Sequence, residues 1–219
     1  MSFPRVFAFG VLFVAAMAHA ETPGSGLLGD AKAGETKAAA CGACHGVDGN
    51  SADATYPKLA GQNESYIVRQ LGQFKAGKRT NPIMMPFAAT LSEQDMHDVG
   101  AYFASKQASP GQTDEAYVQR AQQLFRAGDA KLGVPACMAC HGPAGRGMAG
   151  AGYPQLSGQW ADYVLAKLTE WKNGTTWGDD AQAKIMPDIA KRLGEADIAA
   201  LASYVEGLHT AGAVAAAKQ

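Results

Sequence analysis

This chain of 219 residues contains four cysteines, and all four belong to C-x-x-C-H motifs. The motifs are CGACH at 41–45 and CMACH at 137–141. Thiols three positions apart on a helical turn can reach both vinyl groups of one porphyrin, and the next histidine can offer its imidazole to the iron. The motifs therefore predict two covalently attached haem c groups. The predicted residues are Cys41, Cys44 and His45 for the first haem and Cys137, Cys140 and His141 for the second.

Other uses of a C-x-x-C pair fit this sequence less well. A redox dithiol needs no following histidine and usually follows a strand, and the sequence shows no strand pattern. Structural zinc pairs usually lie some 15–20 residues apart. Here Cys44 and Cys137 are 93 positions apart. Disulfides within such short loops would be strained and would cross-link nothing distant, whereas thioether bonds to haem use all four thiols.

The sixth ligand of each iron decides whether the iron only carries electrons or also binds a substrate. A methionine thioether opposite the histidine closes the site and raises the reduction potential. Downstream of His45 the candidates are Met84, Met85 and Met96. Met96 falls on the apolar face of a predicted helix, where a role in the core is favoured. The first ligand is therefore Met84 or Met85.

The second iron has two candidate methionines downstream of His141, namely Met148 and Met186. Met148 follows the histidine by only seven residues. That stretch is too short to pass round the porphyrin edge to the opposite face. Met186 is therefore the predicted ligand, and we expect both irons to be closed to substrates.

The segments that must position these residues occur twice in the chain. The stretch YPKLAGQNESYIVRQLGQFKAG from Tyr56 aligns without a gap with YPQLSGQWADYVLAKLTEWKNG from Tyr153. The segment from Ile83 aligns in the same way with the segment from Ile185. Each half has a haem motif, Y-P-x-L-x-G-Q, an amphipathic segment, a Met-bearing loop and a closing amphipathic segment. The sequence therefore indicates a tandem duplication.

The repeat also favours one of the two neighbouring methionines as the first ligand. Met84 precedes Leu91 by seven residues, as Met186 precedes Leu193. Met85 has a competing argument, since it precedes a proline, as Met186 does. A packed closing helix cannot slide by one residue, whereas a proline can move along a loop at little cost. We therefore predict Met84 as the ligand, with Met85 packing on the haem edge or facing solvent.

Two prolines are candidates for holding the ligand histidines in place. A ligating imidazole normally donates its other N–H to an acceptor, which fixes the ring and tunes the ligand. Pro57 and Pro154 follow the two haem motifs in the repeated Y-P-x-L segment. A proline carbonyl with fixed φ is a suitable acceptor, although a simple turn proline is the alternative interpretation.

Hydrophobic periodicity predicts helices and no sheet. Ile67, Leu71 and Phe74 recur at spacings of three and four residues, which places them on one helical face. Ser92 and Asp95 form a plausible N-cap pair for the closing helix of the first half. No segment alternates with period two over a useful length. The predicted fold is all-α, with two tandem helical domains that each surround one haem.

The N-terminal segment resembles an export signal. It has a cation at Arg5, an apolar run over 6–17 and an A-x-A cleavage site at 18–20. The apolar run is shorter than the roughly 20 residues that a membrane-spanning helix needs. We therefore expect cleavage after Ala20, a mature protein outside the cytoplasm and no membrane anchor.

The expected domain boundaries follow from the repeat and from composition. The signal peptide covers 1–20, the first domain 21–107, a polar linker 108–116, the second domain 117–211 and a flexible tail 212–219. The formal net charge of −1 and the even spread of charge exclude a basic nucleic-acid-binding protein. Neither half is charged enough to indicate which protein it binds.

The two C-x-x-C-H motifs and the doubled Y-P-x-L-x-G-Q resemble those of the dihaem cytochrome c4 family, over roughly 30–208. The resemblance implies a periplasmic protein, soluble or associated with the membrane surface, built from two class I cytochrome c domains. It implies redox protein partners, with electrons passing to a terminal oxidase or another respiratory acceptor. It places the axial methionines at Met84 and Met186. We expect a monomer, and the donor is left open.

Three functions are compatible with these patterns. An electron carrier without substrate chemistry is favoured, because two closed irons leave no place for a substrate. A dihaem enzyme, such as a peroxidase or a thiosulfate-oxidising dehydrogenase, would need one open or exchangeable iron site. A fixed electron-transfer subunit of a larger complex is the third alternative.

Overall fold

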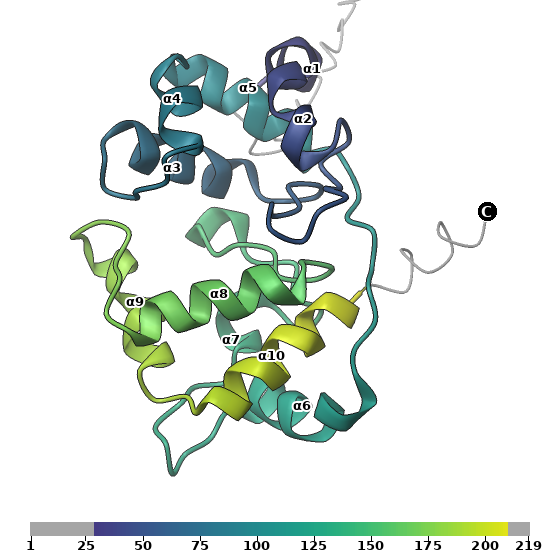
Figure 1. The fold of residues 1–219 in the computed structure, drawn as a ribbon, viewed down its shortest axis with the longest axis vertical. Helices are drawn as coiled ribbons and strands as arrows, with labels where there is room; N and C mark the ends of the chain where they lie inside the picture. Colours follow the sequence, from purple (N-terminus) through teal and green to yellow (C-terminus); the bar gives the residue numbers. More distant parts are fainter. Residues whose placement is uncertain (1–28, 210–219) are drawn as a thin grey trace, which may run out of the picture.

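Five α-helices form the first half of the protein in the computed structural model, which describes residues 29–209 (Figure 1). Asp30 caps the first helix by accepting the N–H groups of Lys32 and Ala33. Ser92 and Asp95 form a reciprocal capping box at the last helix, as predicted. The helices are α1 (Ala31–Lys37), α2 (Gly42–His45), α3 (Glu64–Lys75), α4 (Met84–Ala89) and α5 (Glu93–Ala104), with the 3-10 helix η1 (Ala38–Ala40) after α1.

The second half repeats this order of helices. Its elements are η2 (Glu115–Tyr117), α6 (Val118–Ala127), α7 (Met138–His141), η3 (Ala149–Ala151), α8 (Ala161–Lys172), α9 (Ala181–Ala190) and α10 (Glu195–Gly207). Between residues 29 and 209 the only β structure consists of isolated bridges. The predicted all-α fold is therefore confirmed.

Each half has its own hydrophobic core. In the first half α5 packs against α1 and α3, and in the second half α10 packs against α6 and α8. The buried face of α3 carries Ile67, Leu71 and Phe74, the residues predicted from their spacing. The buried clusters keep to one half each, as Figure 1 shows for the two stacked groups of helices.

The first and last helices of the first half cross at very short distance. A side chain at Gly34 in α1 would place its Cβ 2.0 Å from the carbonyl oxygen of Asp98 in α5. Only glycine fits this crossing without a backbone shift. In the second half, α6 contributes the fully buried Ala121 to the core that it shares with α10.

The expected loops around Met84 and Met186 are helical instead. Met84 begins α4, where the Asn81 side chain accepts the N–H groups of Ile83 and Met84. Met186 lies inside α9, which Asp180 caps. A capping side chain satisfies the free N–H groups of a first helical turn, so each segment can be helical despite its proline.

The chain between the halves runs along one side of the molecule (Figure 1). Gly111 donates its N–H to the carbonyl of Glu206, and Asp114 donates its N–H to the Ser203 hydroxyl. These bonds attach the connecting segment to α10. The expected signal peptide 1–20 and tail 212–219 lie outside the described residues. Across residues 29–209 no helix combines the length and the apolarity needed to cross a membrane.

Candidate haem-binding cavity

Both C-x-x-C-H motifs lie on single helical turns. Cys41 is the N-cap of α2 and Cys137 is the N-cap of α7, and each helix ends at its histidine. The histidine N–H bonds to the carbonyl of the first cysteine at 3.0 Å in both motifs. This turn puts the two thiols on one side, as thioether attachment to a single porphyrin requires. All four cysteines are free thiols.

The two histidines are held in the tautomer that a metal ligand needs. His45 Nδ1 lies 2.8 Å from the Pro57 carbonyl oxygen, and His141 Nδ1 lies 2.9 Å from that of Pro154. A carbonyl oxygen only accepts, so Nδ1 carries the proton and Nε2 keeps its lone pair. Burial lowers the pKa of both histidines, and the hydrogen bonds to the prolines oppose this only partly. Each imidazole is therefore neutral at pH 7 and can coordinate iron through Nε2.

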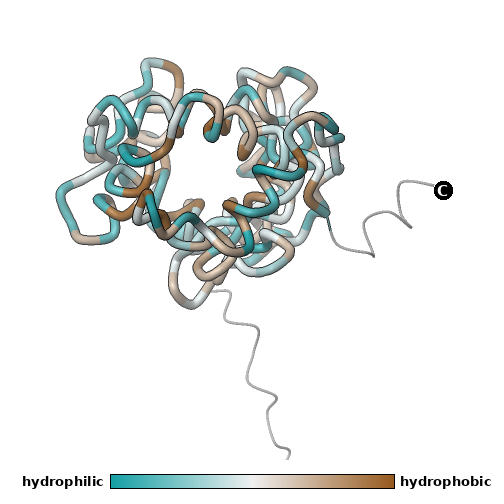
Figure 2. The backbone as a smooth tube through the Cα atoms, turned by 90° about the horizontal axis from the view of Figure 1, so that it is seen from below, coloured by the Kyte–Doolittle hydropathy of each residue, from teal (hydrophilic) through white to brown (hydrophobic). Residues whose placement is uncertain are grey.

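One cavity of about 750 Å³ connects the two motifs. Its walls are largely apolar side chains from both halves, and all four motif cysteines and both histidines line it. Seen along the long axis, several hydrophobic segments lie on the inner side of the ring that the backbone traces (Figure 2). A porphyrin is a large apolar plate, so this lining, the free thiols and the neutral imidazoles fit two haem groups.

The methionines differ in their relation to this cavity. Met84 and Met186 both line it, together with their neighbours Ile83 and Ile185. Met84 and Met85 both pack against the core of the first half, but Met85 is not among the residues that line the cavity. Met84 therefore shares with Met186 a position on the cavity wall, which Met85 does not have. Pro57 and Pro154, whose carbonyls bond to the two histidines, also lie on the cavity wall.

Two glutamines that the sequence reasoning missed make the main polar contacts between the halves. Gln62 accepts the N–H of Gln155 at 2.8 Å and donates to the Gln155 carbonyl at 3.0 Å. Gln159 makes the same pair of bonds to Lys58, at 2.8 and 2.9 Å. Both are the last residue of the repeated Y-P-x-L-x-G-Q. A repeated polar residue that lies in neither a haem motif nor a cap was the signal that could have found them.

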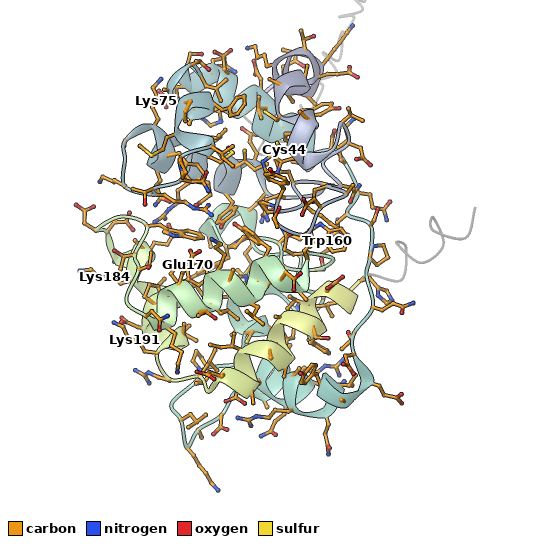
Figure 3. All side chains as sticks on the ribbon, in the orientation of Figure 1. Cys44, Lys75, Trp160, Glu170, Lys184 and Lys191 are labelled. Carbon is orange, nitrogen blue, oxygen red and sulfur yellow. The ribbon has the colours of Figure 1, made fainter. Side chains whose placement is uncertain are left out.

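A tryptophan and an arginine also take part in the contact between the halves. Trp160 lies at this boundary (Figure 3), with its ring under the Lys58 ammonium and its N–H bonded to the Ser51 hydroxyl. Arg79 stacks on Trp177 at 3.5 Å and donates to the Tyr163 hydroxyl. Cys44, also labelled in Figure 3, belongs to the first half and is partly buried on the cavity wall.

Within residues 29–209, the ion pairs that cross the boundary all have their cation in the first half and their carboxylate in the second. The cations Arg69 and Lys78 come from the first half, and the carboxylates Asp180 and Asp179 come from the second. The pairs are partly or largely exposed, so each contributes little stability. Total charges for the two halves, which are equal, could not reveal this local asymmetry.

Comparison with known proteins agrees with this geometry. The family model for cytochrome c matches residues 31–107 and again residues 118–209. Cytochrome c4 from Pseudomonas aeruginosa is 50% identical over 181 residues, which cover 83% of this chain and 90% of the relative. The crystal structure of reduced recombinant cytochrome c4 from Pseudomonas stutzeri matches with a TM-score of 0.79 and 44% identity, covering 83% of this chain and 100% of that one.

A relative with a more specific name also matches. The thiosulfate dehydrogenase electron acceptor of Stutzerimonas stutzeri is 40% identical over 172 residues, which cover 76% of this chain and 78% of the relative. The relatives therefore include proteins named for accepting electrons from an enzyme.

Proposed function

The chain belongs to the cytochrome c4 family, and we propose that it is a periplasmic electron carrier whose two haem irons each have one histidine and one methionine ligand. The two covalent haem c groups supply reversible one-electron reduction at iron. The proposed ligands are His45 with Met84 and His141 with Met186. The observation that carries the proposal is the cavity lined by both histidines and both methionines.

The residues of the chain do three things in this function. The cysteines fix the cofactors by thioether bonds on rigid helical turns. The prolines hold the histidine rings and keep Nε2 free for iron. The methionines close the remaining positions, so that no substrate gains access and the potentials rise. The proposed domains are 21–107 and 117–211, joined by the segment 108–116.

Partner and location follow from the family and from the N-terminal sequence. We propose that residues 1–20 direct export and are removed, and that the mature protein exchanges electrons with other redox proteins. The name of the relative from S. stutzeri makes an oxidising enzyme a candidate donor, and a terminal oxidase remains the candidate acceptor. Reduction of the purified protein by such an enzyme, followed optically, tests the donor.

Ligand replacement tests the ligation. Met84→Leu and Met186→Leu should each abolish the near-infrared Met-to-iron band of one haem and lower its potential, within the roughly 0.8 V over which axial ligands set haem potentials. Met85→Leu is the matched control and should leave both bands in place. Loss of a band with Met85→Leu but not with Met84→Leu would reverse the assignment. High-spin features in the unmodified protein would favour the dihaem enzyme instead.

A further inference from the structure

We propose that Gln159 and Gln62 are positioning residues that each set the reduction potential of the haem in the opposite half. This proposal rests on the proposed histidine ligation. Each glutamine acts through one peptide group of the other half, which it shares with that half's ligand histidine. The electronic properties of each haem are therefore controlled in part by the other domain.

The first shared peptide group joins Pro57 and Lys58. Its carbonyl oxygen accepts the Nδ1–H of His45 at 2.8 Å. Its N–H, on Lys58, donates to Oε1 of Gln159 at 2.8 Å. Lys58 is 6% exposed and Gln159 is 9% exposed, so water competes little for these bonds. A continuous chain of hydrogen bonds thus runs from the ligand of the first iron to a side chain of the second half.

The second shared peptide group, between Pro154 and Gln155, is arranged in the same way. Its carbonyl accepts the Nδ1–H of His141 at 2.9 Å, and its N–H donates to Oε1 of Gln62 at 2.8 Å. Gln62 is 6% exposed. The two chains cross the boundary in opposite directions.

The backbone before each glutamine turns its side chain toward the other half. Gly61 and Gly158 have φ values of 72° and 76°, a left-handed conformation that favours glycine. Their N–H groups bond to the carbonyls of Phe103 and Val205, near the ends of the closing helices. The turn is therefore anchored to the core of its own half, and the glutamine is held rigidly as it reaches across.

A hydrogen bond to the N–H of a peptide group strengthens its carbonyl as an acceptor, because the two dipoles polarise one another. A stronger acceptor draws the Nδ1–H of the histidine and makes Nε2 a better electron donor to iron. Better donation stabilises the ferric state and lowers the potential. Loss of the glutamine amide should therefore raise the potential of the haem in the other half.

Gln159→Leu and Gln62→Leu test the crossed relation, with the two potentials followed separately by NMR redox titration of assigned haem methyl resonances. Gln159→Leu should raise the potential of the His45 haem by more than that of the His141 haem. Gln62→Leu should do the reverse. In the reduced protein, the Nδ1–H resonance of His45 should move upfield in the first variant, and that of His141 in the second.

Gln73→Leu is the matched control. Its side chain also reaches across the boundary and donates to the carbonyl of Trp177, but this bond involves neither shared peptide group. It should leave both Nδ1–H resonances unchanged. If Gln159→Leu fails to take up haem, Gln159→Asn makes the same prediction, because the shorter side chain withdraws its oxygen from the Lys58 N–H.

Equal shifts of both potentials, matching those of Gln73→Leu, would overturn the proposal, and so would unchanged Nδ1–H resonances in both the Gln159 and the Gln62 variants. The ligation is judged separately, from the near-infrared bands of the unmodified protein. If both bands are present and the glutamine variants show no crossed effect, only the proposal on the glutamines fails.

Discussion

The first half contributes cations to the contact between the halves and the second half contributes carboxylates, yet both halves contribute an equivalent glutamine. The glutamine contacts involve the peptide groups that hold the ligand histidines. The ion pairs instead join α3 and the segment after it to the residues just before α9, and they involve neither of these peptide groups. Residues that serve the cofactor are thus the same in the two repeats, whereas residues that only join the repeats have diverged. Four predictions test this difference between the halves.

The largest expected effect is a difference in stability loss when two leucines at matching positions of the repeat are each replaced by alanine. Leu193 is 2% exposed in the core of the second half, while Leu91 at the matching position is only partly buried. Leu193→Ala should destabilise the second half by about 2–5 kcal/mol, because it leaves a cavity, and Leu91→Ala should cost less in the first. Hydrogen exchange of peptides from each half, measured against denaturant, tests this. Equal losses would mean that the two cores are equivalent.

An added methyl group should destabilise the helix packing of the first half, whereas the loss of a methyl group should destabilise that of the second half. Gly34→Ala forces its Cβ against the backbone of α5 and should destabilise the first half by about 1–3 kcal/mol. In the second half the buried Ala121 already fills its site, so Ala121→Gly should cost about 1 kcal/mol or somewhat more. Thermal unfolding followed by the haem absorption of each variant provides the comparison. A stabilising Gly34→Ala would contradict the close crossing.

Acid should weaken the first half through a carboxyl that the second half lacks. The hydrogen bond from Lys37, with those from Asp30 N–H and Gln94, lowers the pKa of Asp98 to about 2, and Ala200 holds the matching place in α10. A depressed folded-state pKa gives stability that is present above the unfolded value of about 3.9 and is lost as pH falls through the folded value. Between about pH 4 and pH 2 the first half should therefore lose this contribution.

Asp98→Asn should flatten that pH dependence in the first half and leave the second unchanged, as measured by hydrogen exchange at several pH values. Asp197→Asn is the control in the second half, where the neighbouring Arg120 lowers the pKa of Asp197. It should affect only its own half. An unchanged slope in Asp98→Asn would show that Asp98 is not the group responsible.

The smallest expected effect concerns the ion pairs between the halves. Their exposure means that salt should screen them, and added salt should slightly increase hydrogen exchange around residues 175–180. The double variant Asp179→Asn/Asp180→Asn should lose this salt dependence. Asparagine also caps helices well, so α9 should keep its start. Salt dependence that persists in the double variant would assign it to other charges.

Much of this organisation could be predicted from the sequence because it depends on local patterns. The helical faces follow from spacing, and the cap at Ser92 and Asp95 follows from residue type. Pro57 and Pro154 could be named because a ligand histidine needs an acceptor at a fixed place. The helical setting of Met84 and Met186 was not predicted, because it depends on the side chains of Asn81 and Asp180, which accept the free N–H groups at the start of each helix.

The contact between the halves could not be predicted, because it depends on how two folded surfaces meet. Besides the N–H of the next residue, the side chains of Gln62 and Gln159 bond to residues more than 90 positions away in the chain. The choice between Met84 and Met85 is a finer case. The repeat favoured Met84, and the structure puts it on the cavity wall, but which sulfur binds iron remains a prediction.

The reciprocal glutamine exchange has a consequence for the origin of the molecule. A contact in which each side offers the same groups is isologous, the kind that two identical chains form in a symmetric dimer. Two copies of a single-domain ancestor could have associated through it before the gene was duplicated and fused. Fusion by a short connection makes the association intramolecular, at an effective concentration in the millimolar range. A contact too weak to hold two separate chains together is then sufficient to keep the two halves associated. The other residues at the boundary can therefore diverge.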